Sequence, residues 1–348
     1  MSVDKKRLFF LDSVRGIAAL MVASAHFIER TPLHKVWMFK YLNLGQMGVV
    51  AFFIISGMVI PFSFKPGRSP LISFFISRVF RLYPAYWLSV FLAFVIFTFL
   101  YHIQIPIITV IKNLTMFQSI LQTPDLFGVY WTLIIEIFFY VCCACLFSLN
   151  LLSERKVLFI LSACMLILAF TLSIARFLFE RKLPVAIPLC MSLMFFGGAW
   201  RNVSLGIADY ATKRFSVIFI YSFLILIIPI SLMAYNRDYG HGENAFSYIV
   251  SYAAGIALTI ILTTKLKINS KIFVYLGAIS YSVYLMHPFF LEIFYAKSNM
   301  SRAFDFLIFF IYILSIISLA SLTYLFIERP SVNLGRRINN ALCKKKEL

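Results

Sequence analysis

The chain has 348 residues, of which 61% are hydrophobic and 13% are charged, and its mean hydropathy is +0.90. This composition excludes a soluble domain, in which about a quarter of the residues are charged. The net charge of +18 comes from basic residues scattered through short loops, so it favours membrane orientation over nucleic-acid binding. The six cysteines lie in apolar segments or near the C-terminus without zinc-type spacing, so we expect neither a disulfide nor a metal site.

Apolar runs of about 20 residues recur along the chain, as expected for helices that cross a bilayer. The sequence therefore predicts an all-α, polytopic membrane bundle of about ten transmembrane helices. In chain order they cover residues 8–28, 45–64, 82–100, 128–149, 157–179, 185–200, 214–234, 245–264, 272–295 and 303–327. The polar segment 101–127 is too often broken to span. We expect one membrane domain with its core at 8–327, a short basic cytoplasmic tail at 328–348, and no appended soluble domain.

The distribution of positive charge predicts the orientation of this bundle. If both termini are cytoplasmic, the inner segments hold 21 of the 32 lysines and arginines and the outer segments hold 10. Positive residues are enriched on the cytoplasmic side of membrane proteins. The sequence thus places the N- and C-termini inside, and the first apolar run is expected to be a retained signal anchor.

The first predicted helix carries three ionisable side chains within LDSVRGIAALMVASAHF, namely Asp12, Arg15 and His26. At 100° per residue they share one stripe of the helix surface. A charged side chain at the centre of a membrane helix costs about 2.5–3.5 kcal/mol, so this stripe must face protein or water. The simpler alternative is a structural ion pair of Asp12 with Arg15 and a histidine at the interface.

Two later helices also carry polar side chains within apolar sequence. Glu136 is a lone intramembrane carboxylate in WTLIIEIFFY, which marks a functional site unless it is a hydrogen-bonded structural residue. In ISYSVYLMHPF, Tyr284 and His287 fall on one helix face, followed by Pro288. This segment is either an active-site wall or a kinked, packed helix.

An arginine pair lies in SRVFRLYPAYW, at the expected cytoplasmic mouth of the third helix. Arg78 and Arg81 are one helical turn apart, a spacing at which two guanidinium groups can bind one phosphate group. Ordinary anchoring of positive charge on the inner side is the alternative.

These stretches resemble the membrane-bound acyltransferase family 3, which includes bacterial O-antigen and exopolysaccharide O-acetylases. The matching motifs are LDSVRGIAALMVASAH (11–26), FFIISGMV (52–59), SRVFRLYPAYW (77–87), WTLIIEIFFY (131–140), ISYSVYLMHP (279–288) and IERP (327–330). They follow the family order over most of the chain, with Thr132 where the family usually has serine.

The resemblance implies an integral membrane enzyme of a bacterial inner membrane. Such an enzyme moves an acyl group, often acetyl, from acyl-CoA to a hydroxyl of a carbohydrate or lipid-linked glycan. Acyl-CoA is then a substrate, and no bound cofactor is implied. Some relatives carry an extracytoplasmic esterase-like domain for the final transfer. Because none is expected after IERP, the reaction either ends in the membrane domain or passes the acyl group to a separate extracytoplasmic protein.

Acyl transfer to an alcohol needs a base, a donor for the developing oxyanion and help for the leaving thiolate. We expect His26 to be the base and Glu136 to orient it or share its proton. Arg78 and Arg81 would hold the CoA phosphates, and Arg15 would line the path of the CoA arm. Four further side chains are expected to line the site: Asp12, Trp131, Tyr284 and His287.

A transporter or flippase of a glycan or lipid-linked sugar is the rival hypothesis, since it also explains buried charges among many helices. Transporters usually show internal repeats and paired broken helices, and the sequence has no evident repeat. A non-catalytic binding protein is a third hypothesis, but it would not need to keep His26. The sequence leaves open the acceptor and the length of the acyl group.

Overall fold

The computed structural model describes residues 8–64, 69–236, 244–296 and 305–344, and this part of the chain is helical without strands. Eight of its helical segments are long and apolar enough to cross a membrane, or up to nine if one bent pair forms a span. The all-α membrane architecture is thus confirmed, whereas the number of ten and the sides of the termini stay predictions. Parts of the expected basic ends, 1–7 and 345–348, lie outside the described residues.

The chain divides into two compact units, which are described separately. The first comprises residues 1–25, 35–58 and 151–280, and the second comprises 26–34, 59–150 and 281–348. The helices of the first unit are the beginning of α1 (Phe9–Glu29), α2 (Trp37–Tyr41), α3 (Leu44–Val59), α7 (Arg155–Phe179), α8 (Ala186–Ser204), α9 (Tyr210–Ala234), α10 (Ala245–Thr264) and α11 (Lys271–Ala278).

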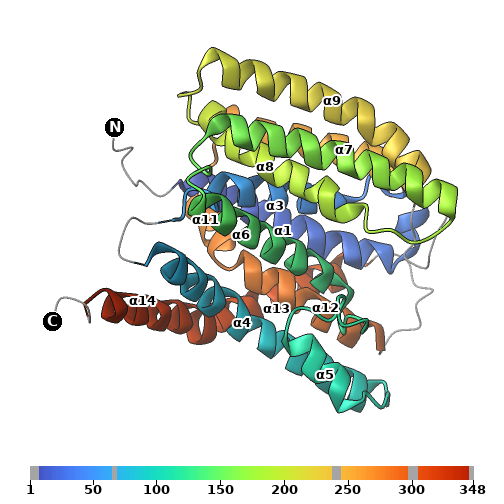
Figure 1. Cartoon of the computed structure of the whole chain (residues 1–348). Coiled ribbons are helices and arrows are strands. Elements are labelled where there is room, and N and C mark those ends of the chain that lie inside the picture. The colour runs from blue at the N-terminus through green and yellow to red at the C-terminus, as the bar shows by residue number, and fades with distance from the viewer. Residues whose placement is uncertain (1–7, 65–68, 237–243, 297–304, 345–348) are drawn as a thin grey trace. The chain divides into compact units, whose positions relative to one another are not determined.

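Helix α8 forms the core of the first unit. Its residues from Pro188 to Trp200 are all buried, and it packs against α7 and α9 (Figure 1). It stands where the sequence predicts a helix at 185–200. Pro188, two glycines and the polar residues near its end lower its hydropathy, so it is not among the candidate spans. A helix surrounded by other helices does not need a strongly apolar surface.

The backbones of α3 and α8 approach closely at two glycines. A Cβ atom at Gly57 would lie 1.8 Å from the carbonyl oxygen of Met194, and one at Gly197 would lie 2.1 Å from that of Ile54. Small residues at helix interfaces permit such contacts in membrane proteins. Gly57 belongs to the FFIISGMV motif, so the glycine of this motif serves helix packing.

The second unit contains the remaining helices. They are η1 (Pro32–Lys35), α4 (Pro70–Val95), η2 (Ile96–Leu100), α5 (Ile107–Leu114), η3 (Gly128–Tyr130), α6 (Trp131–Ser148), α12 (Ser280–Ala296), α13 (Phe306–Thr323), η4 (Tyr324–Glu328) and α14 (Arg329–Lys344). Between α4 and α6 the chain forms no spanning helix, as the sequence predicts for 101–127.

Helix α4 begins at Pro70, twelve residues before the predicted start of the third helix. The predicted start at residue 82 was wrong. Charged side chains such as Arg78 and Arg81 next to an apolar run are typical of a loop, but here they belong to the helix. Proline at the first helical turn favours helix initiation, and the apolar residues after it continue the helical pattern. Both arginines therefore lie inside α4 rather than at its mouth.

The predicted solvated tail contains α14, which packs along α4 (Figure 1). Ser331, Gly335 and Asn339 recur every four residues and so share one helix face. Ser331 Oγ donates to the carbonyl of Phe80 at 2.6 Å, and Asn339 Nδ2 donates to that of Ser73 at 3.1 Å. This face contacts α4 over two turns and ties the end of the chain to the arginine-bearing helix.

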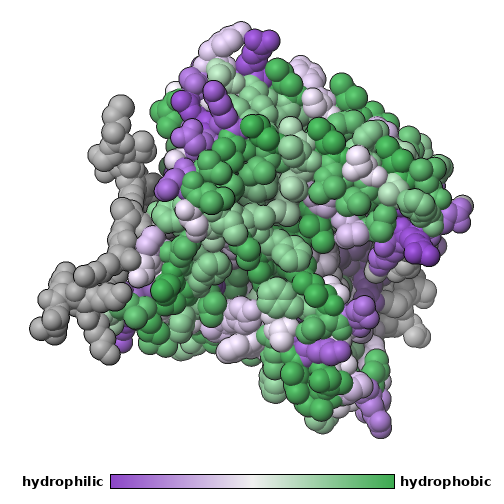
Figure 2. All heavy atoms as spheres, viewed as in Figure 1, coloured by the Kyte–Doolittle hydropathy of each residue, from purple (hydrophilic) through white to green (hydrophobic). Residues whose placement is uncertain are grey.

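Apolar side chains cover most of the surface visible in Figure 2. Helices α7 and α9 each expose several of them, including Ile160, Ile167, Ile218 and Ile225. Exposed isoleucines on helices of this length and hydropathy indicate faces that lie against lipid.

We predict that Gly197→Ala destabilises the protein by about 1–3 kcal/mol, because its methyl group would meet the backbone of α3 at Ile54. Thermal unfolding in detergent, followed by tryptophan fluorescence, should show a lower Tm. Gly128→Ala is the matched control, since a Cβ atom there meets nothing within 4 Å. Equal Tm values for the two variants would show that α3 and α8 do not pack as closely as described.

Candidate active site

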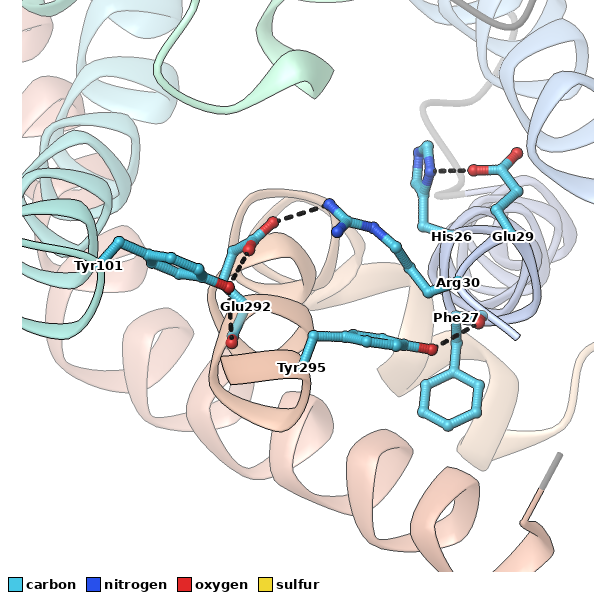
Figure 3. Close-up of polar contacts among 7 residues, drawn as sticks. All are labelled: His26, Phe27, Glu29, Arg30, Tyr101, Glu292 and Tyr295. Atoms are coloured by element: carbon cyan, nitrogen blue, oxygen red, sulfur yellow. Dashed lines mark hydrogen bonds and ion pairs between the residues drawn. The ribbon is translucent and has the colours of Figure 1, made fainter. Parts of the chain in front are cut away.

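His26 lies in the last turn of α1, next to a carboxylate that the sequence analysis did not consider. Its Nδ1 atom is 2.8 Å from Oε2 of Glu29, three residues further along (Figure 3). An ionised carboxylate only accepts hydrogen bonds, so Nδ1 is the donor and the neutral ring carries its lone pair on Nε2. The imidazole is 36% exposed. This arrangement gives His26 the tautomer and the access that a general base needs.

His26 and His287 lie next to each other in the structure. The sequence analysis expects both in the active site, His26 as the base and His287 in its lining. The two rings are stacked, with centroids 5.3 Å apart and planes inclined by 11°. His287 is fully buried on α12, with Nδ1 3.3 Å from the carbonyl of Val283 and no hydrogen-bond partner at Nε2. A buried, unpaired ring nitrogen is costly, so this pair of imidazoles is a feature that folding alone does not explain.

Tyr284 supports His287 from its own helix. The edges of their rings meet at a centroid distance of 5.8 Å. The Tyr284 hydroxyl donates to the carbonyl of Val129 and shares a hydrogen bond with Thr132, both at 2.8 Å. Thr132 thus keeps a hydroxyl group at the position where the resembling motif has serine. These contacts fix α12 to the start of α6.

The arginine pair and Glu136 are linked through Tyr140. The Arg78 guanidinium lies over the ring of Tyr140, with Cζ 5.3 Å from the ring centroid, and the Tyr140 hydroxyl donates to Glu136 Oε1 at 2.5 Å. Glu136 and Arg81 both lie near enough to act electrostatically on Arg78. The Nε atom of Arg78 is buried without a hydrogen-bond partner.

The position of Glu136 differs from what its expected role requires. Its hydrogen bond goes to Tyr140, whereas the carboxylate at His26 Nδ1 belongs to Glu29. The sequence predicts Arg78 at the cytoplasmic mouth of the third helix, outside its first turn. With α4 starting at Pro70, Arg78 lies two turns inside and reaches α6.

The other predicted site residues occupy separate places. Asp12 and Arg15 lie half-buried on α1, in the part that belongs to the first unit. Trp131 is the first residue of α6 and has a 36% exposed side chain. Among the described residues, no three His, Cys, Asp or Glu side chains are grouped as a metal site would need.

Glu328 of the IERP motif is buried and accepts a hydrogen bond from the Ser282 hydroxyl of α12. The π-helical turn η4 at Tyr324–Glu328 changes the helical register here, which a regular period cannot reveal.

A second polar cluster, formed by Arg30, Glu292 and Tyr101, lies one turn beyond His26 (Figure 3). The sequence did not predict it. Arg30 Nη2 donates to Glu292 Oε1 at 3.0 Å, and the Tyr101 hydroxyl donates to Glu292 Oε2 at 2.6 Å. Burial and the neighbouring Glu292 carboxylate raise the pKa of Tyr101 to about 12, so this hydroxyl stays protonated. Only the four-residue spacing from His26 to Arg30 was visible in the sequence.

Comparison with known proteins identifies the family of the chain. A family model described as an acyltransferase domain matches residues 8–325. The chain belongs to the acyltransferase 3 family. A protein of Acidianus two-tailed virus named "Putative acetyltransferase" is 25% identical over 286 residues, which cover 79% of this chain and 80% of the viral protein. No solved structure matches the chain. The predicted family is thus confirmed, and with it acyl transfer as the general activity.

We predict that Glu29→Gln lowers the kcat of this acyltransferase by roughly tenfold or more. The loss should be smaller than the ~10⁴-fold seen when a buried triad aspartate is replaced, because Glu29 is 42% exposed. Thermal stability should hardly change, since exposed pairs contribute about 0–1 kcal/mol. Glu154→Gln, an exposed carboxylate at the start of α7, is the control. Equal kcat values for both variants would contradict a positioning role for Glu29.

Proposed function

We propose that this membrane protein is an O-acyltransferase that moves an acyl group, acetyl in the simplest case, from cytoplasmic acyl-CoA to a hydroxyl of an exported or cell-surface carbohydrate. The observation that carries the proposal is the His26–Glu29 pair, whose geometry leaves Nε2 of His26 as an accessible base. Its occurrence in a chain of the acyltransferase 3 family supports acyl transfer over glycan transport.

In the proposed reaction, Nε2 of His26 takes the proton of the acceptor hydroxyl while the hydroxyl oxygen attacks the thioester carbonyl. The tetrahedral intermediate then collapses, the carbon–sulfur bond breaks, and the CoA thiolate receives the proton from the imidazolium. Glu29 stabilises the imidazolium formed between these steps, as a carboxylate does in catalytic triads. Since His26 suffices as base, we favour direct transfer over an acyl-enzyme.

The donor side of the proposed site is the arginine pair of α4. CoA carries a diphosphate and a 3′-phosphate, and guanidinium groups bind such anions through charge-assisted hydrogen bonds. Arg78 is held against the Tyr140 ring and keeps an unpaired Nε, which supports an anion-binding role. We assign Arg81 to the same phosphates and Arg15, with Asp12, to the path of the CoA arm.

The acceptor side rests on the family resemblance. We propose a neutral hydroxyl of a polysaccharide or lipid-linked glycan as acceptor, membrane lipids as the surroundings, and a bacterial inner membrane as the location. A separate extracytoplasmic protein that accepts the acyl group is compatible with the same chemistry. We expect no nucleic acid among the partners.

The proposal is tested with purified protein in detergent, by following thiol release from acetyl-CoA in the presence of extracted lipopolysaccharide and dextran. His26→Ala should lower kcat by about 10²–10⁴-fold, the usual contribution of general base catalysis. The double variant Arg78→Ala/Arg81→Ala should raise KM for acetyl-CoA by about 10²- to 10⁴-fold, since two hydrogen bonds to charged groups contribute about 1.5–3 kcal/mol each.

Arg155→Ala is the control for both variants. Arg155 forms an exposed ion pair with Asp209, and both residues belong to the first unit, whereas His26, Arg78 and Arg81 belong to the second. This variant should behave as the wild type. Movement of labelled glycan into vesicles without any thiol release would contradict the acyltransferase proposal and support the transporter hypothesis.

A further inference from the structure

Acyl transfer also needs a group that stabilises the negative charge on the carbonyl oxygen of the tetrahedral intermediate. We infer that Arg30 is this group, and that Glu292 and Tyr101 hold it in place. The inference rests on the function proposed above and adds a catalytic residue to it. It follows from the position of Arg30, from its fixed geometry and from its unused donors.

The position of Arg30 relates it directly to the proposed base. Arg30 follows His26 by four residues, and its backbone N–H donates to the carbonyl of Phe27 at 3.2 Å, so the turn of α1 continues past Glu29. Arg30 thus comes directly after the last residue of the helix that carries His26. In Figure 3 both side chains leave the same end of α1, and the guanidinium lies between the imidazole and Glu292.

The guanidinium is held from two sides. Nη2 donates to Glu292 Oε1 at 3.0 Å, and Cζ lies 5.6 Å from the centroid of the Tyr295 ring. Glu292 is itself fixed, because its other oxygen accepts from Tyr101 at 2.6 Å. Tyr295 donates to the carbonyl of Phe27 at 3.3 Å and thereby joins α12 to the end of α1. A donor fixed before the reaction avoids the cost of reorganisation as charge develops.

The Arg30 guanidinium also has N–H groups with which it could donate hydrogen bonds to a substrate. It has five N–H groups, and the structure describes one hydrogen bond from it, to Glu292. The Arg30 side chain is 41% exposed, whereas that of Glu292 is 13% exposed, so the carboxylate is the supporting partner and the guanidinium the accessible one. Arg30 therefore resembles a preset oxyanion donor more closely than a closed structural ion pair.

In the reaction, the carbonyl π bond opens as the acceptor oxygen attacks, and the carbonyl oxygen becomes negative. Arg30 donates a charge-assisted hydrogen bond to that oxygen while His26 holds the proton of the acceptor. When the carbon–sulfur bond breaks, the carbonyl re-forms and the thiolate takes the proton from His26. Arg30 itself gains and loses no proton in this sequence.

The test compares Arg30→Gln, Arg30→Lys and the charge exchange Arg30→Glu/Glu292→Arg, with acetyl-CoA as donor and extracted lipopolysaccharide and dextran as acceptors. Arg30→Gln should lower kcat by about 10²–10³-fold and leave KM for acetyl-CoA nearly unchanged. Arg30→Lys should recover part of this loss because it restores the charge. The exchange should regain the Tm of the wild type but not its kcat, since it restores the ion pair and moves the guanidinium.

Recovery of both kcat and Tm in the charge exchange would overturn the inference. Arg30 would then serve only as one partner of an ion pair that joins the end of α1 to α12. Wild-type kcat in Arg30→Gln would overturn it as well. Arg155→Gln is the matched control for a lost guanidinium in an exposed ion pair. If folded wild-type protein releases no thiol with any acceptor, the proposed function fails first, and the role of Arg30 fails with it.

Discussion

The cost of leaving a polar group unpaired in an apolar environment governs how the ionisable side chains of this chain are arranged. In the second unit four such contacts involve a charged side chain: Glu29 at His26, Arg30 at Glu292, Tyr140 at Glu136 and Ser282 at Glu328. Nε of Arg78 and Nε2 of His287 are buried without partners, and both lie where a substrate is expected.

The paired polar side chains of the second unit form two separate centres. One surrounds His26 and, in the function proposed above, supplies a base, an orienting carboxylate and a fixed cation, which are the groups that acyl transfer to an alcohol requires. The other surrounds Arg78 and suits a phosphate-bearing donor. We interpret their separation as a division of labour: one centre holds the CoA head while the other performs the transfer. Glu136 belongs to the arginine centre, and Glu29 takes the orienting position.

The places of the helices could be predicted because long apolar runs have one stable form in a bilayer. The meeting of His26 with His287 could be expected from the motifs. The start of α4 at Pro70, by contrast, was hidden by Arg78 and Arg81, since charge near an apolar run resembles a loop. Arg30 and Glu292 are 262 residues apart, and no local pattern reveals a pair that only tertiary packing creates.

We propose that acyl-CoA binds on the cytoplasmic side and that the acceptor receives the acyl group on the other side of the membrane. The most direct measurement uses sealed inside-out membrane vesicles, with labelled acetyl-CoA added outside and dextran or extracted lipopolysaccharide trapped inside. We expect label on the trapped acceptor for the wild type and very little for His26→Ala. Label confined to acceptor supplied outside would contradict it, because donor and acceptor would then bind at one face.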